Sequence, residues 1–278
     1  MPRQRGRVRR ASHILAHVVL ILGAVVMVMP FVWQILTSIK TLPESTHVPP
    51  VWFPAEAQWS NFARALTAFP FTRMLWNSVV VTVVQVSAQV LFSAMAAYAF
   101  ARLRFRGSNA VFIGVLSMMM VPGQFLLIPQ YQIVNSLGLL NTLPAIFLPG
   151  LVSVFGTFLL RQYFLTLPRE LDEAATIDGA GPIRIFWSIL LPLARPALVA
   201  FGVLATVWSW RDMLWPLVVN TDPAAQTLAV GLANLRGQYL TEYPVLMAGS
   251  LMATVPLIVV FLLFQRQFIS GIALSGLK

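Results

Sequence analysis

The sequence predicts an all-α membrane protein with six transmembrane helices. The mean hydropathy is +0.78, and the composition is 58% hydrophobic but only 10% charged. Long apolar runs recur along the 278 residues, and a spanning helix needs about 20 such residues. We place the spans at residues 13–38, 74–100, 110–134, 143–165, 196–219 and 244–267.

The first of these spans follows a basic N-terminus, residues 1–12, which holds five arginines in MPRQRGRVRR. The apolar stretch after it is too long for a signal peptide and lacks a small-residue cleavage site, so we expect it to be retained. Residues 13–278 then form one membrane domain. With six spans, fourteen of the nineteen Lys and Arg residues fall in or beside cytoplasmic segments and four outside. This asymmetry predicts a multi-pass protein with both termini in the cytoplasm.

Several classes of site are excluded or disfavoured by composition. There is no cysteine, so no disulfide or thiolate metal site forms. His13 and His17 are spaced like a metal pair, but polar residues at a helix start explain them more simply, and we expect no metal. The net charge of +10 fits topology rather than nucleic-acid binding in so apolar a chain. In the second span Ser93, Ala97 and Ala101 recur every four residues, which favours close helix packing.

Scarce acidic residues gather in the predicted cytoplasmic loop 166–195, hereafter the acidic segment. Pro168 suits a first helical turn, so we predict a short helix over 168–178 with Gly179 as its C-terminal cap. Gly181-Pro182 then breaks the chain before a second helix. Four of the nine acidic residues of the chain lie in this segment, at Glu170, Asp172, Glu173 and Asp178.

Two interpretations of the acidic segment are open on these residues alone. A charged loop helix is often only solvated. Phe186, Trp187 and Ile189 would be unusual on such a loop, and the small residues at its turn suit the close approach of another surface. We therefore favour a docking site for another protein.

The acidic segment resembles the EAA loop of binding-protein-dependent ABC importer permeases. The match runs through EAA at 173–175, DGA at 178–180, Phe186, Ile189 and Leu191-Pro192. The resemblance extends over nearly all of residues 13–278, and four further stretches are similar to the carbohydrate, MalG-like branch of this family. They are TSIK at 37–40, WRDMLWP at 210–216, TLAVGLANLRGQY at 227–239 and FQRQFISGIALSGLK at 264–278.

The resemblance implies the type I ABC importer permease fold, with six spans and a cytoplasmic coupling helix. It also implies that the chain lies in the lipid bilayer of a prokaryotic inner membrane and forms a heterodimer with a second permease subunit. The further partners that it implies are two ATP-binding subunits and an extracytoplasmic solute-binding protein, and the implied substrate is of the sugar type. The residues that it assigns to coupling with the ATPase are Glu173, Ala174, Ala175, Asp178, Gly179 and Ala180.

The chain lacks the Gly-Lys-Ser/Thr end of a phosphate-binding loop. Its two lysines are Lys40, which follows isoleucine, and Lys278 at the terminus. We therefore expect a transport subunit that is not an enzyme and holds no cofactor, with ATP and magnesium bound on the partner ATPase subunit.

Polar side chains within spans tend to face a cavity or a partner helix. Gln85 and Gln89 are such residues in span two. Trp208, Asp212 and Trp215 of span five share one helical face, and aromatic rings beside polar groups suit a sugar. An aromatic belt with a snorkelling arginine is the competing interpretation. Similar permeases more often have asparagine at the position of Arg211. The candidates for the substrate path are Asn77, Gln124, Trp208, Arg211, Asp212 and Trp215.

The predicted external loop 220–243 is polar and rich in small residues. In similar permeases this loop meets the solute-binding protein, although a solvated hairpin has the same composition. The candidate contacts are Asn234, Arg236, Gln238 and Tyr239.

Three alternatives to a sugar importer were weighed. A permease for a non-sugar solute would contain the same acidic segment, so the sequence leaves this alternative open. An ion-coupled secondary transporter predicts acidic residues in mid-membrane, and Asp212 is the only one there, beside Arg211. A membrane enzyme needs a buried nucleophile with its base, or paired carboxylates or histidines, and the spans offer none.

Overall fold

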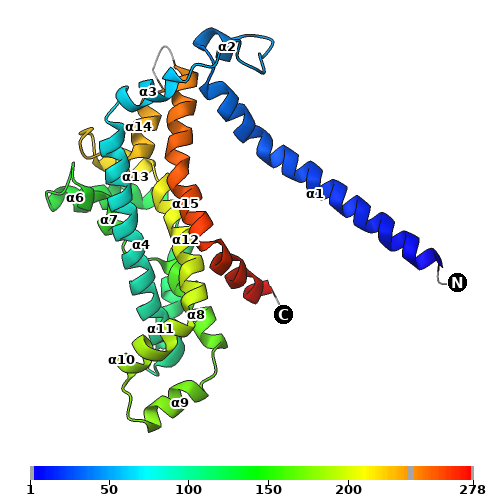
Figure 1. Ribbon diagram of the computed structural model, residues 1–278. Helices are drawn as coiled ribbons and strands as arrows, with labels where there is room; N and C mark the ends of the chain where they lie inside the picture. Colours follow the sequence, from blue (N-terminus) through cyan, green and yellow to red (C-terminus); the bar gives the residue numbers. More distant parts are fainter. Residues whose placement is uncertain (1–2, 237–240, 277–278) are drawn as a thin grey trace. The chain divides into compact units, whose positions relative to one another are not determined.

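The computed structural model describes residues 3–236 and 241–276, and their side chains from residue 16 to 236 and from 241 to 265. Within those ranges every regular element is helical (Figure 1), which confirms the predicted all-α class. The chain forms two compact units, residues 1–69 with 235–252, and residues 70–234 with 253–278.

The first unit begins with the long helix α1, Arg3–Ser38. Its apolar side chains are exposed, as at Leu20 and Met27, which is expected of a helix surrounded by lipid. α2, Leu42–Thr46, is held by a capping box between Thr41 and Glu44. The unit also contains α3, Ser60–Thr67, and the first turns of α15, Tyr243–Gly276.

A buried lysine lies two residues after the end of α1. The side chain of Lys40 is fully buried. Its Nζ donates to the carbonyl of Val51 at 2.5 Å and lies 4.2 Å from the centre of the Trp33 ring. Burial lowers the pKa of Lys40, and the neighbouring carboxylate of Glu44 partly offsets this effect.

The second unit is built around α4, Phe71–Arg102, which packs against α8, Val154–Thr166, and α12, Arg195–Arg211. The predicted small-residue stripe of α4 is buried, since Ser93, Ala97 and Ala101 are at most 6% exposed. Ser93 Oγ donates to the carbonyl of Ser153 at 3.1 Å. Small side chains thus let α8 approach α4 closely.

This unit also contains the part of α15 from residue 253 onward, and its other helices are short. Before α8 they are α5 Ser108–Ser117, η1 Met118–Met120, η2 Gly123–Leu126, α6 Leu127–Ser136, α7 Leu143–Phe147 and η3 Leu148–Gly150. After α8 they are α9 Glu170–Ile177, α10 Pro182–Ile185, the π-helix η4 Phe186–Leu190, α11 Leu191–Leu193, α13 Leu214–Val219 and α14 Leu228–Asn234.

Three described helices are long and apolar enough to cross a membrane, at Ala16–Ser38, Phe71–Arg102 and Tyr243–Gln265. Three bent pairs raise the number to as many as six, if each pair is one span. The pairs are Ser108–Met120 with Gly123–Ser136, Leu143–Gly150 with Val154–Thr166, and Pro182–Leu193 with Arg195–Arg211, bent by 95°, 42° and 76°. Six spans therefore stay a prediction.

The helix predicted over 110–134 is not continuous. The chain turns by 95° between Met120 and Gly123, where Val121 adopts an extended conformation. Pro122 follows it and disfavours a helical conformation in the residue before it.

Candidate functional site

The turn of the acidic segment has the geometry that its sequence predicts. α9 ends before Gly179, which has a φ of +81°. The N–H of Ala180 donates to the carbonyl of Ala175 at 2.9 Å, and the N–H of Gly179 donates to that of Thr176 at 3.0 Å. These two bonds around a left-handed glycine form a Schellman motif. The predicted cap at Gly179 is therefore confirmed.

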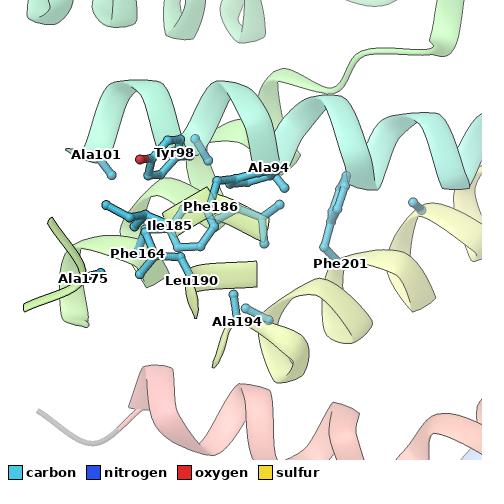
Figure 2. Close-up of a cluster of buried hydrophobic side chains, with 14 residues drawn as sticks. Ala94, Tyr98, Ala101, Phe164, Ala175, Ile185, Phe186, Leu190, Ala194 and Phe201 are labelled. Carbon is cyan, nitrogen blue, oxygen red and sulfur yellow. The ribbon is translucent and has the colours of Figure 1, made fainter. Parts of the chain in front are cut away.

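A hydrophobic cluster fixes the inner face of the segment. Figure 2 shows Ile185 and Phe186 beside Tyr98 of α4, with Phe164 of α8 close by. The ring centres of Tyr98 and Phe186 are 5.2 Å apart, and Tyr98 Oη donates to the carbonyl of Pro182 at 3.0 Å. Ala175 of α9 belongs to the same cluster. α9, through Ala175, and α10, through Ile185, are thus both packed in a cluster with α4 and α8.

One ion pair adds to this attachment. Arg102 Nε at the end of α4 lies 3.2 Å from Asp172 Oδ2 in α9, and their side chains are 5% and 22% exposed. The Nη2 of Arg102 also donates to the carbonyl of Leu167 at 2.8 Å. A single arginine therefore links α4 to both the start and the body of the acidic segment.

The structure divides the six predicted coupling residues into two groups. Ala175 is buried and Ala180 is partly buried against the hydrophobic cluster. The other four are exposed on the outer face, beside Ile177, which is 86% exposed. They are Glu173, Ala174, Asp178 and Gly179.

A polar cavity of about 630 Å³ lies between α4, α12 and the start of α8. Gln85 and Gln89 of α4 line it. Ser209 Oγ donates to Gln85 Oε1 at 3.0 Å, and Gln89 Nε2 donates to the carbonyl of Gly150 at 2.6 Å. Both glutamines are thus fixed at the cavity wall.

The cavity brings together only some of the residues predicted for the substrate path. Trp208, Arg211 and Asp212 line it. Trp215 does not, and its Nε1 donates to the carbonyl of Ala145 at 3.0 Å. Asn77 is buried and donates to the carbonyl of Gln226 at 2.8 Å.

The sixth candidate, Gln124, is exposed in η2 and is not part of the cavity lining. Ser153 and Ser209 do line the cavity but were missed. Ser153 had a sequence signal, because serine is a favoured helix N-cap residue, and in the structure its Oγ accepts from the N–H of Gly156 at 3.0 Å.

The predicted common helical face of Trp208, Asp212 and Trp215 is wrong. α12 ends at Arg211, and Asp212 is extended with a ψ of 118°. The physical reason is Pro216, whose ring clashes with a helical carbonyl four residues earlier, at Asp212. Arg211, the last residue of α12, and Asp212 after it line the cavity, whereas Trp215 does not.

The residues predicted to contact a binding protein are described only in part. Asn234 and Arg236 are exposed, and Asn234 Nδ2 donates to Gln226 Oε1 at 3.3 Å. Gln238 and Tyr239 lie outside the described residues. Within the part of the chain that the structure covers, no group of three or more His, Asp or Glu residues is arranged to hold a metal ion.

The chain is similar to a family of transport proteins and to several of its members. A family described as "Binding-protein-dependent transport system inner membrane component" matches residues 89–273. The chain is 38% identical over 258 residues to the arabinooligosaccharides transport system permease protein AraQ of Halalkalibacterium halodurans, covering 92% of each chain. It is 32% identical to the sn-glycerol-3-phosphate transport system permease protein UgpE of Brucella suis, covering 95% of this chain and 97% of the other.

A solved structure is also similar. It is a chain of a bacterial ABC transporter involved in the import of the acidic polysaccharide alginate. The two chains superpose with a TM-score of 0.82 at 25% sequence identity, over 94% of this chain and 98% of the other.

Proposed function

Since the chain belongs to the family of binding-protein-dependent transport system inner membrane components, we propose that it forms, with a second permease subunit, the path of an ABC importer for a sugar or sugar derivative. The observation that carries the proposal is that one face of the acidic segment is attached to the membrane helices and the other is exposed. Its inner face is fixed to α4 and α8, while Glu173, Ala174, Asp178 and Gly179 are exposed on its outer face. A contact on that face moves the membrane helices directly.

The energy for transport comes from two ATP-binding subunits, which carry the ATP and magnesium. Exposed carboxylates at Glu173 and Asp178 accept charge-assisted hydrogen bonds from such a partner. The small side chain of Ala174 and the bare backbone of Gly179 allow it to approach closely. Ala175 and Ala180 act from the other side, by holding α9 and its turn on the cluster.

The substrate is a sugar or sugar derivative that a solute-binding protein delivers from outside. The named relatives support this class, since one belongs to a transport system for arabinooligosaccharides and another to a system for sn-glycerol-3-phosphate. The polar cavity supports it too, because Gln85, Gln89 and Asp212 offer groups for hydroxyls, and the ring of Trp208 packs against C–H faces. Asn234 and Arg236 belong to the surface that receives the binding protein.

The coupling role of the acidic segment is tested with Gly179→Leu. A Cβ at this position meets no atom within 4 Å, so the variant folds with only the strain of a left-handed leucine, about 1–2 kcal/mol. We expect uptake per ATP hydrolysed to fall by about tenfold or more, since coupling energies are about 1–3 kcal/mol. Uptake and ATP hydrolysis are measured in vesicles that contain the whole transporter.

The matched control is Gly138→Leu. Gly138 also has a left-handed φ, +67°, and open space around its Cβ position, but it lies in the turn after α6. This variant carries the same strain and should keep normal coupling. Normal transport by Gly179→Leu would contradict the coupling role.

A further inference from the structure

A second cavity, of about 520 Å³, lies where α4 ends and α5 begins, next to the start of the acidic segment. Its lining contains basic, apolar and neutral polar residues but no acidic one. Five arginines from four parts of the fold converge on it. They are Arg102, Arg104, Arg106, Arg161 and Arg169.

Two of these arginines are held by the protein itself. Arg102 pairs with Asp172, but its buried Nε satisfies no hydrogen bond. Arg161 Nε donates to the carbonyl of Phe100 at 3.2 Å, and its guanidinium lies 4.1 Å from the centre of the Phe112 ring. Both therefore stand at the cavity as fixed positive charges.

The side chains of the other three arginines have no such partner among the described residues. Arg104, Arg106 and Arg169 are exposed, and the side chain of none of them forms an ion pair with a residue that the structure describes. Within that part of the chain, Arg169 takes part in hydrogen bonds only through its backbone carbonyl, which accepts from the N–H groups of Asp172 and Glu173. Their guanidinium groups are free to meet an anion from solution or from the membrane.

The N-terminus of α5 adds further donors. Its N-cap, Gly107, supplies no side-chain hydrogen bond, and Ser108 and Asn109 line the cavity. The N–H of Ser108 is taken by the carbonyl of Phe105. The N–H of Asn109 has no acceptor among the described residues. An uncapped helix start beside free arginines is a favourable site for a phosphate oxygen.

Apolar side chains border the same cavity. Phe105 and Leu165 line it, and each is 43% exposed. A soluble phosphate would leave these surfaces in water, whereas the glycerol backbone and acyl chains of a lipid cover them. The arrangement of charge beside apolar surface at the end of a spanning helix is that of a lipid headgroup site.

From these observations we propose that the cavity binds the phosphate of an anionic phospholipid. The headgroup phosphate lies between Arg104, Arg106 and Arg169 at the start of α5, and the acyl chains lie along Phe105 and Leu165. Because Arg169 precedes α9 and Arg102 holds Asp172, the bound lipid stands next to the attachment of the acidic segment. This site is distinct from the polar cavity and does not depend on which substrate is transported.

The test is lipid binding to the purified full chain, measured by native mass spectrometry and lipid titration. The probes are phosphatidylglycerol, phosphatidylcholine as the zwitterionic control, and inorganic phosphate. The variant is Arg104→Gln/Arg106→Gln, which removes two charges that form no ion pair with a described residue. Because each arginine near an anionic headgroup contributes a factor of about five, we expect binding of phosphatidylglycerol to weaken about thirtyfold.

The matched control is Arg184→Gln/Arg195→Gln, two exposed arginines of the acidic segment that do not line the cavity. It should bind phosphatidylglycerol like the unchanged chain. Equal binding of phosphatidylcholine, or equal loss in the control, would overturn the proposal. So would inorganic phosphate that binds at the two arginines while phosphatidylglycerol does not, because the site would then serve a soluble anion.

Discussion

Asp172 differs from its acidic neighbours in the segment 166–195. It pairs with Arg102, whereas Glu173 and Asp178 are exposed and form no ion pair within the described residues. The acids that looked alike in sequence therefore have different tasks. Asp172 attaches α9 to the end of α4, and the other two are available to a partner.

We predict that Asp172→Asn loosens α9. The change removes the charge that meets the buried guanidinium of Arg102 and costs about 1–3 kcal/mol of local stability. Hydrogen–deuterium exchange of the amides of residues 170–177 should therefore become faster. Asp178→Asn is the control, because its exposed carboxylate has no ion-pair partner there, and exchange should stay unchanged. Equal exchange in both variants would show that the ion pair does not hold α9.

We also predict that Arg211→Asn changes substrate preference. Arg211 lines the polar cavity together with Asp212 and the two glutamines of α4, so its charge favours an anionic sugar derivative over a neutral sugar. Uptake of a panel of neutral and anionic sugars should shift toward the neutral ones by about tenfold or more, the value of one charge-assisted contact of about 1.5–3 kcal/mol. Unchanged rates and preference would leave Arg211 as a snorkelling residue.

Helix packing in the second unit depends on the positions of glycines, which have no side chain. A Cβ on Gly156 of α8 would lie 2.3 Å from Cζ of Phe201 in α12, far inside van der Waals contact. A Cβ on Gly202 would lie 3.7 Å from Cγ2 of Val90 in α4, an ordinary contact. Two glycines that look equivalent in the sequence thus have opposite packing requirements.

These two glycines give a matched pair of variants. Gly156→Ala should destabilise the protein by about 1–3 kcal/mol, because Phe201 is fully buried and has no free space to enter. Gly202→Ala should be neutral or stabilising by up to about 1 kcal/mol, since alanine favours a helix. Thermal unfolding of the purified chain in detergent checks both. Phe201→Leu in the Gly156→Ala chain should recover part of the loss, and its failure to do so would place the strain elsewhere.

At the scale of the whole molecule, the charge asymmetry predicts which face each loop occupies. Val48 lies in the loop predicted outside and is 88% exposed, and Ile177 lies in the acidic segment and is 86% exposed. The chain has no cysteine, so a single introduced thiol reports its own position without a background signal.

We predict that a membrane-impermeant thiol reagent labels Val48→Cys in intact cells. Ile177→Cys should be labelled only after the membrane is permeabilised, because the basic residues around 166–195 stay in the cytoplasm. Labelling is measured on the purified chain by mass shift. Labelling of Ile177→Cys in intact cells would show that the acidic segment lies outside the cell. It would then contradict both the predicted orientation and a contact with a cytoplasmic partner.

The sequence by itself determined the helical class, the short helix of the acidic segment and its cap at Gly179. These features depend on apolar runs and on glycine, proline and acid at fixed local positions, which act within one or two helical turns. The family resemblance implies a coupling role for that segment, and the string of residues that carries the resemblance is also local.

Only the tertiary structure decided which side of that helix is free and which residues form the polar cavity. Ala174 and Ala175 are neighbours in sequence, yet one is exposed and the other packs in the cluster with α4 and α8. Trp208 and Trp215 lost their predicted common face because Pro216 breaks α12 at Asp212, while Gln85 and Ser209, 124 positions apart, meet at the cavity wall. Such contacts arise from packing between distant helices, and no local pattern encodes them.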